Sequence, residues 1–266
     1  MSESTLSLNT FERAWLSWYD YIGNDHLATG IFFFCMHETV YFGRSLVWMF
    51  IDRIPHFRKY KIQQQKTTTK EQEWTCMKHL LVSHFTIEGP IMYFFHPTMK
   101  AFGLCTTVPF PSLYTMAWQC AIFLIFEDTF HYFGHRLLHR PYFYKRVHKL
   151  HHEFSAPFGL TAAYAHPFEI AFLGIGTVGA PTLFSLLGGD LHMVTVYVWV
   201  VIRLLQAVDA HSGYDFPWSL HNWLPFWGGA DWHDKHHERF LVNYSSSFKW
   251  WDIIMGTQAN KLRSPT

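Results

Sequence analysis

Long runs of apolar residues alternate with short polar and basic stretches along this chain. The first run, residues 29–51, is long enough to cross a bilayer as a helix of about 20 residues. It contains His37, Glu38 and Arg44. Because ionisable side chains are costly at membrane depth, these three should face a protein interior, or the helix should lie partly in the membrane interface.

The next two apolar runs lead towards a histidine-rich region. Residues 78–96 form the second run, and residues 101–126 carry no charge. Pro109 and Pro111 should prevent a helix at the start of that uncharged run. We therefore expect a helix that begins near residue 112 and continues into the histidines that follow.

Two more apolar runs, residues 170–189 and 191–208, are separated by Gly-Gly-Asp, which is typical of a turn. About four helices should cross the membrane in hairpins, so the expected fold is an all-α integral membrane protein. We interpret the chain as one membrane-embedded domain with five parts: a polar segment at 1–28, membrane segments at 29–126, histidines at 127–168, a hairpin at 169–209, and a C-terminal cap at 210–266.

Basic residues indicate the side of the membrane on which the polar parts lie. Residues 53–70 are rich in Lys and Arg, and the histidine region adds five basic residues: Arg136, Arg140, Lys145, Arg146 and Lys149. Positive charge beside membrane helices marks the cytoplasmic side. The later hairpin returns the chain to that side, so we expect a cytosol-facing helical cap that carries all the histidines.

The composition agrees with a membrane protein. Of the 266 residues, 49% are apolar and only 15% are charged, and the net charge is +1. Nucleic-acid binding requires a concentrated basic surface, so we expect membrane lipid rather than nucleic acid as a partner. The four cysteines lie far apart, which suits a reducing compartment or burial in the membrane.

Three histidine clusters carry the candidate chemistry. They comprise His135 and His139, then His148, His151 and His152, and finally His233, His236 and His237. Positions i, i+3 and i+4 share one face of a helix, so each cluster can direct its imidazoles at a common point. This spacing indicates a metal site; the alternative is a basic, pH-sensitive surface patch.

Eight imidazoles exceed what one ion with four or six ligands accepts, so the clusters predict two ions. His211, which follows an apolar run, should complete the ligand set, and His166 is a further candidate. Neutral nitrogen donors suit zinc, iron, copper or nickel, and spacing does not choose among them. Carboxylates that accept the second ring N–H would orient the ligands, and five candidates lie near the histidines: Glu127, Asp128, Asp209, Asp231 and Asp234.

These motifs resemble a known enzyme superfamily. HRLLH, HKLHH and HDKHH, together with EDTFHYFGHR, YAHP, HSGYDFPW and NYSSSFKWWDIIMGT, are similar to the fatty acid hydroxylase and sterol desaturase superfamily. Within it, they most resemble the C-4 methylsterol monooxygenases, over roughly residues 27–257. The chain departs from that pattern at Ala163 and Gln206, where similar proteins often carry Glu, which could alter hydrogen bonds behind the ligands or substrate contacts.

The resemblance implies a multi-pass enzyme of the endoplasmic reticulum membrane whose histidines hold two non-haem iron ions. It implies a reaction with O2, driven by electrons from NAD(P)H through a cytochrome b5-type carrier and its reductase. The substrate would be a sterol precursor whose C-4 methyl group becomes alcohol, aldehyde and then carboxylate, and other sterol C-4 demethylation enzymes would be partners. Alternatives are another sterol or lipid hydroxylase, a sterol C-5 desaturase, and a non-enzymatic membrane metal-binding protein.

Overall fold

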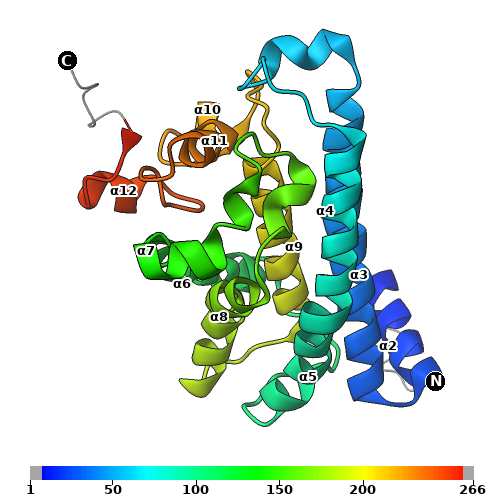
Figure 1. The fold of residues 1–266 in the computed structure, drawn as a ribbon. Helices are drawn as coiled ribbons and strands as arrows, with labels where there is room; N and C mark the ends of the chain where they lie inside the picture. The colour runs from blue at the N-terminus through cyan, green and yellow to red at the C-terminus, as the bar shows by residue number, and fades with distance from the viewer. Residues whose placement is uncertain (1–7, 260–266) are drawn as a thin grey trace.

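The computed structural model describes residues 8–259, and within this range it consists of helices and connecting loops without a β-strand (Figure 1). The prediction of an all-helical protein is thereby confirmed for the described part of the chain. Figure 1 shows α3, α4 and α9 running side by side, with α10 and α11 near one end of α9 and α12 farther to one side.

The longer elements are α2 (Thr10–Ile22), α3 (Asp25–Asp52), α4 (Lys70–Ser83), a π-helical turn η2 (His84–Glu88), α5 (Gly89–Lys100), α6 (Leu113–Leu138), α8 (Pro167–Leu186) and α9 (Met193–Ala210). The shorter ones are η1 (Pro55–Tyr60), α7 (Pro141–Phe143), η3 (Tyr144–His148), η4 (His151–Glu153), η5 (Gly159–Ala163), α10 (Leu220–Trp223), α11 (Ala230–Arg239) and α12 (Trp250–Ile254).

Helix α6 begins where the two prolines end. Ser112 is its N-cap, and the hydroxyl of Ser112 accepts the backbone N–H of Thr115 at 3.0 Å. The helix then runs without interruption to Leu138 and carries His135 in its last turn. The prediction that this helix continues into the histidines is confirmed.

The polar N-terminal part contains a helix that the apolar pattern did not predict. Helix α2 starts with a capping box in which Asn9 and Glu12 each accept the other's backbone N–H. The Trp15 side chain is buried, and its indole N–H donates to the carbonyl of Thr106 at 2.8 Å. An amphipathic helix therefore lies where sequence reasoning expected only a polar segment.

The helices enclose two apolar cores. In the first core, α3, α6 and α9 bring together Phe33, Phe123 and Trp199. The second core packs Tyr41 of α3 against Leu160 of η5, and the Tyr41 hydroxyl donates to the Leu160 carbonyl at 2.8 Å. Both cores hold α9 in place, and α9 ends directly at His211.

Two helices are long and apolar enough to span a membrane, namely α8 and α9. Only 28% of the apolar stretch of α8 is buried, compared with 56% for α9. A mostly exposed apolar helix is unfavourable in water and favourable in lipid. The structure thus supports membrane association, and the expected total of about four spans stays a prediction.

Replacing Asp252 with Ala should strongly destabilise the region around α11 and α12. The buried Asp252 carboxylate accepts the backbone N–H groups of Tyr244 and Ser245, each at 2.9 Å, and the indole N–H of Trp232 at 3.0 Å. Since a buried donor left unpaired costs about 1–3 kcal/mol, we expect a loss of at least about 3 kcal/mol. The midpoint of thermal unfolding in detergent measures this loss, and Glu238→Ala, an exposed change, should leave it unchanged.

Candidate metal centre

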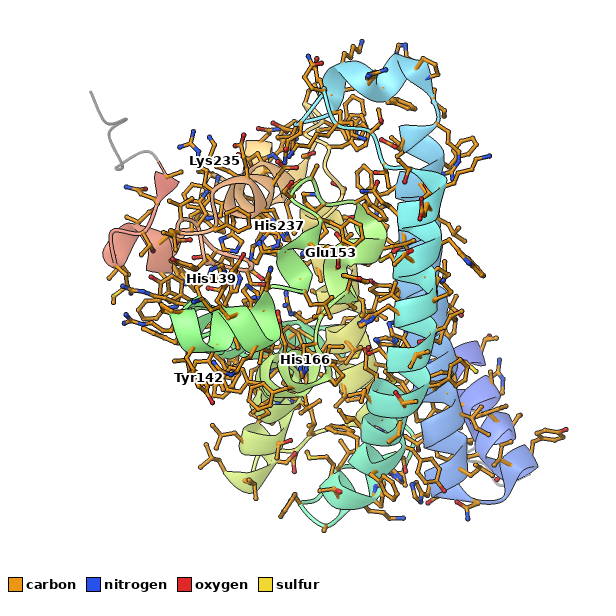
Figure 2. All side chains as sticks on the ribbon, in the orientation of Figure 1. His139, Tyr142, Glu153, His166, Lys235 and His237 are labelled. Atoms are coloured by element: carbon orange, nitrogen blue, oxygen red, sulfur yellow. The ribbon has the colours of Figure 1, made fainter. Side chains whose placement is uncertain are left out.

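The structure brings together the nine histidines that the clusters and His211 provide. They come from the end of α6, the turns η3 and η4, the residue after α9, and α11, and each is at most 8% exposed. Figure 2 places His139 and His237 in the region between the end of α6 and α11. The rings form two groups: His135, His139, His148, His152 and His236 (the five-histidine group), and His151, His211, His233 and His237 (the four-histidine group).

The two groups alternate along the sequence. In HKLHH, His148 and His152 belong to the five-histidine group and His151 to the four-histidine group. In HDKHH, His233 and His237 belong to the four-histidine group and His236 to the five-histidine group. On a helix, i+4 lies about 40° from i on one side and i+3 about 60° on the other, since each residue turns about 100°. In α11, residues i and i+4 therefore share a centre, while i+3 points to the neighbouring one. His148, His151 and His152 show the same division, although η3 is a π-helical turn and η4 a 3-10 turn.

The Nε2 atoms of the five-histidine group converge on one point. His148 Nε2 lies 3.1 Å from His135 Nε2, 2.9 Å from His139 Nε2 and 3.0 Å from His152 Nε2. His236 Nε2 closes the group, 3.1 Å from His139 Nε2 and 3.2 Å from His152 Nε2. Five nitrogen donors thus surround a space of the size of one ion.

The four-histidine group has the same design. His233 Nε2 lies 2.9 Å from His211 Nε2 and 3.2 Å from His237 Nε2, and His211 Nε2 lies 3.4 Å from His151 Nε2. The groups are neighbours, because the ring centroids of His152 and His237 are 4.6 Å apart. The predicted pair of adjacent sites therefore has a geometric basis.

Hydrogen bonds on the outer side of the rings fix their tautomers. His135 Nδ1 faces the carbonyl of Tyr244 at 2.8 Å, and His236 Nδ1 faces that of Val242 at 2.6 Å. A carbonyl only accepts, so Nδ1 carries the hydrogen and Nε2 presents a lone pair. The same holds for three pairs at the four-histidine group: His151 with Tyr164, His211 with Ala207, and His237 with Phe154.

These lone pairs fit a metal ion. Nitrogen lone pairs about 3 Å apart repel one another unless a cation lies between them, and burial lowers the pKa of His151 to about 4, which keeps its imidazole neutral. With metal–nitrogen bonds of about 2.1 Å, adjacent ligands lie roughly 3.0 Å apart around an octahedral ion and roughly 3.4 Å apart around a tetrahedral one. The nitrogen spacings of 2.9–3.2 Å in the five-histidine group are thus those expected of ligands that share one ion.

Glu169 is a site residue that sequence reasoning missed. Its carboxylate is 3% exposed and accepts the N–H of His148 Nδ1 at 2.7 Å. A carboxylate behind a ligating imidazole orients the ring and strengthens it as a donor. The signal was available, because Glu169 is an acidic residue at the very start of the otherwise uncharged α8, three residues after His166.

Replacing Glu169 with Gln should weaken metal binding without removing a ligand. The amide keeps the size of the side chain but cannot provide a carboxylate behind His148, and loss of such a partner typically costs 10- to 100-fold in metal affinity or activity. Competition with a graded series of chelators measures the affinity. Glu238→Gln, an exposed change on α11, is the matched control; equal affinities in the two variants would exclude the assigned role of Glu169.

The five carboxylates predicted to orient the rings have other partners in the structure. Glu127 forms an ion pair with Arg203 at 2.6 Å. Asp128 accepts the backbone N–H of Ser247 at 2.8 Å. The remaining contacts are Asp209 with Arg44 at 2.6 Å, Asp231 with His221 at 3.5 Å, and Asp234 with Gln63 at 2.7 Å. Proximity in sequence placed these residues near the rings but on other faces of their helices.

His166 lies outside both groups. It is the N-cap of α8, and its Nδ1 accepts the backbone N–H of Phe168 at 3.1 Å. Figure 2 places it beside the start of α8, away from His139 and His237. His166 therefore begins the helix that carries Glu169, while His211, the other added candidate, does join a group.

A separate buried group of two imidazoles and two carboxylates joins α3 to the π-helical turn η2. Glu38 Oε1 lies 3.0 Å from His37 Nδ1 and 2.8 Å from His84 Nδ1. Glu88 reaches the other ring nitrogens of both histidines, at 3.3 and 3.4 Å. Glu38 hydrogen-bonds to both rings, whereas His84 Nε2 and Glu88 Oε1 have no hydrogen-bond partner among the described residues. His37, Glu38 and His84 together could also hold a metal ion.

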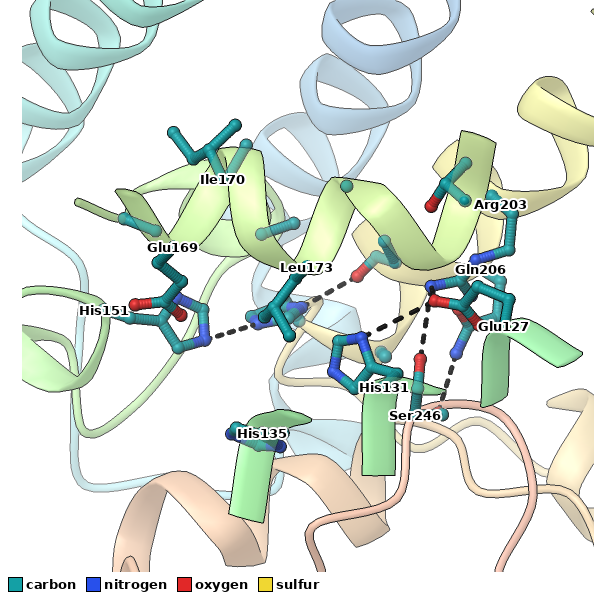
Figure 3. Close-up of a pocket in the computed structure, with 18 of the residues that line it drawn as sticks. Glu127, His131, His135, His151, Glu169, Ile170, Leu173, Arg203, Gln206 and Ser246 are labelled. Carbon is teal, nitrogen blue, oxygen red and sulfur yellow. Dashed lines mark hydrogen bonds and ion pairs between the residues drawn. The ribbon is translucent and has the colours of Figure 1, made fainter. Parts of the chain in front are cut away.

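A cavity of about 190 Å³ connects the two histidine groups (Figure 3). Rings of both groups line it, namely His135, His148, His151, His211 and His233. On the side opposite His135, Figure 3 shows Glu127, Arg203, Gln206 and Ser246 joined by hydrogen bonds. We refer to this space as the metal-facing cavity.

Comparisons with known proteins agree with this site. The family model described as fatty acid hydroxylase matches residues 120–257, which include all nine grouped histidines. Methylsterol monooxygenase erg25B of Aspergillus fumigatus is 56% identical over 97% of this chain and 87% of its own length. C-4 methylsterol oxidase of Candida albicans is 55% identical over 95% and 82%, respectively. No solved structure matches the chain.

The family model covers more than half of the chain, and the relatives cover nearly all of it. The resemblance inferred from the histidine motifs is therefore confirmed. This chain belongs to the fatty acid hydroxylase family.

Proposed function

We propose that this protein is a membrane-bound C-4 methylsterol monooxygenase. The observation that carries the proposal is the metal-facing cavity, which rings of both histidine groups line. A cavity shared by two adjacent metal sites suits oxidation of a group held between them. The identity of 50–56% to relatives named as methylsterol monooxygenases or oxidases supports a sterol C-4 methyl group as that target.

In this proposal, the five-histidine and four-histidine groups each hold one iron ion. When bound, the ions would supply reduction of O2 and oxidation of the methyl group through alcohol and aldehyde to carboxylate. The protein's own part is to fix ligand orientation, through Glu169 and the backbone carbonyls, and to keep the reacting group away from bulk water.

Each of the three oxidations uses one O2 and two electrons. Following the family resemblance, we propose NAD(P)H as the source and a cytochrome b5-type carrier with its reductase as the route. The basic residues near the histidines, such as Arg140, Lys145 and Lys149, provide the positive charge that an acidic carrier would recognise. Other enzymes of sterol C-4 demethylation are the proposed partners that process the product.

We propose a location in the endoplasmic reticulum membrane, with about four spans and the histidine-bearing cap on the cytosolic side. Besides α8 and α9, large apolar side chains are exposed along three other long helices: Leu46, Val47 and Phe50 on α3, Ile91 and Phe94 on α5, and Ile122 and Ile125 on α6. Lipid would cover these surfaces. Residues 53–70, which follow the end of α3, are rich in Lys and Arg. Positive charge at this position favours the cytosolic side for that end of the molecule.

The test uses the full chain purified in detergent. Iron per chain is measured, and then a 4-methylsterol is supplied with NADPH, the reductase and the carrier. We expect about two iron ions per chain and O2-dependent 4-hydroxymethyl, 4-formyl and 4-carboxy products by mass spectrometry. A ring-desaturated product would favour the C-5 desaturase, a hydroxyl elsewhere would favour another hydroxylase, and bound metal without turnover would favour a non-enzymatic metal-binding protein.

A further inference from the structure

We propose that Arg203 binds the C-3 hydroxyl of the sterol, with Glu127 and Gln206 as positioning residues that hold Arg203 in place. This inference rests on the proposed function. It assigns the polar contact that orients the substrate, and it begins from two cavities that meet at Arg203.

The second cavity is a largely apolar space of about 410 Å³ between α3, α5, α8 and α9. Phe33, Ile91, Met92 and Leu204 are among the side chains that line it. Six residues line both this apolar cavity and the metal-facing cavity: Glu88, Ile170, Gly174, Thr177, Arg203 and Ala207. These residues form the junction through which an apolar substrate would reach the metal ions.

Substrate chemistry determines what the junction must recognise. Every sterol carries a hydroxyl on C-3, and C-3 is bonded directly to C-4, whose methyl group is oxidised. When that methyl group faces the metal-facing cavity and the rings fill the apolar cavity, the C-3 oxygen has to lie at or near the junction. A polar oxygen buried there without a hydrogen bond would cost about 1–3 kcal/mol.

Arg203 is suited to this contact. Only two charged residues line both cavities, Glu88 and Arg203. Glu88 lies within ion-pair distance of both imidazoles of the group joining α3 to η2, although its Oε1 has no hydrogen-bond partner among the described residues. As a carboxylate it can only accept a hydrogen bond, whereas Arg203 is 8% exposed and its Nε–H is a buried donor with no hydrogen-bond partner in the described part of the chain. A guanidinium N–H donates and never accepts, so its natural partner is an oxygen lone pair.

Neighbouring groups fix the guanidinium in place. Arg203 Nη2 donates to Glu127 Oε1 at 2.6 Å, and Nη1 donates to the Gln206 side-chain oxygen. Gln206 is anchored in turn, because its amide donates to the carbonyl of Ser246 at 2.8 Å. Glu127 Oε2 is also buried, with no hydrogen-bond partner within residues 8–259, so the site offers an acceptor for the hydroxyl hydrogen as well as a donor for its oxygen.

The test compares a 3-hydroxy-4-methylsterol with its 3-deoxy analogue in the reconstituted, iron-loaded enzyme. The wild type should prefer the hydroxyl-bearing substrate in kcat/KM by about 10- to 100-fold, since a hydrogen bond to a charged group contributes about 1.5–3 kcal/mol. In Arg203→Gln, that preference should fall to within about threefold of unity. Arg203→Lys should retain part of it.

Loss of folding must be separated from loss of recognition. Removing Arg203 alone leaves Glu127 as a buried unpaired charge, so the double variant Arg203→Gln/Glu127→Gln removes both charges together. Iron per chain and the thermal unfolding midpoint show whether the variants are folded. The matched control is Arg44→Gln/Asp209→Asn, another Arg–carboxylate pair that lines neither of the two cavities, in which the preference should be unchanged.

The ratio of kcat/KM for the 3-hydroxy substrate to kcat/KM for the 3-deoxy analogue decides whether Arg203 binds the hydroxyl. If Arg203→Gln or the double variant slows both substrates equally and keeps the wild-type preference, Arg203 has a structural role and the assignment is overturned. If the wild type oxidises neither substrate, the proposed function itself fails. These outcomes are distinguishable because the first requires an active wild type.

Discussion

The variant His151→Ala should lose both turnover and metal. His151 is one of four donors in its group, with its Nε2 facing that of His211 at 3.4 Å and its Nδ1 held by the Tyr164 carbonyl. Because even a partner behind a ligand is worth 10- to 100-fold, removal of a ligand should lower turnover by more than about 100-fold. Metal per chain, measured on the purified protein, should fall towards one ion.

The control is His166→Asn, in which the asparagine oxygen can still accept the Phe168 N–H and keep the α8 cap. His166 lies outside both groups, so this variant should retain metal and turnover. Full activity in His151→Ala would exclude His151 as a ligand. A metal loss in His166→Asn as large as that in His151→Ala would mean that the grouping is incomplete.

Removal of the metal should destabilise the whole histidine-bearing end of the protein. In the described chain, nine buried imidazoles present lone pairs to two small spaces, and repulsion between them replaces metal–ligand bonds once the ions leave. A ligand at about a thousandfold excess over its Kd stabilises a fold by about 4 kcal/mol. For a protein of this size, that loss corresponds to a fall in Tm of roughly 8–16 °C.

Thermal unfolding followed by circular dichroism in detergent, before and after dialysis against a chelator, measures this effect. Anaerobic return of ferrous iron should restore the original Tm. The control is Asp252→Ala, which should lower the Tm because backbone hydrogen bonds are lost, not because metal is lost. Removal of the metal should lower the Tm of this variant further. An unchanged Tm after complete removal of the metal would contradict the view that the ions hold these elements together.

Sequence reasoning found the ligand candidates because helical periodicity is a local property. His135 with His139, and His148 with His152, are four residues apart, and this spacing alone brings their rings together. The same local logic located α6 and its start after Pro111. It also identified His211, which completes the four-histidine group at the end of α9.

Other features depend on contacts between distant segments, which no local pattern contains. Glu169 supports His148 because α8 packs beside the η3 turn, and Glu127 turns to Arg203 because α6 packs against α9. Local geometry separates i+3 from i and i+4, but the placement of α11 opposite the second cluster decides which histidines of the two segments share a centre. Carboxylates chosen by closeness in sequence were therefore a poor guide to the residues that touch the rings.

The adjacent pairs His151–His152 and His236–His237 each send one ring to either centre. An ion captured by one group orders the same backbone that carries donors for the other, so the second ion binds to a chain whose conformational entropy has already been lost. We expect positive cooperativity in loading: when iron is scarce, empty and doubly filled molecules should coexist, with few singly filled ones. Scarcity would then reduce the number of working enzymes while leaving the rate of each one intact.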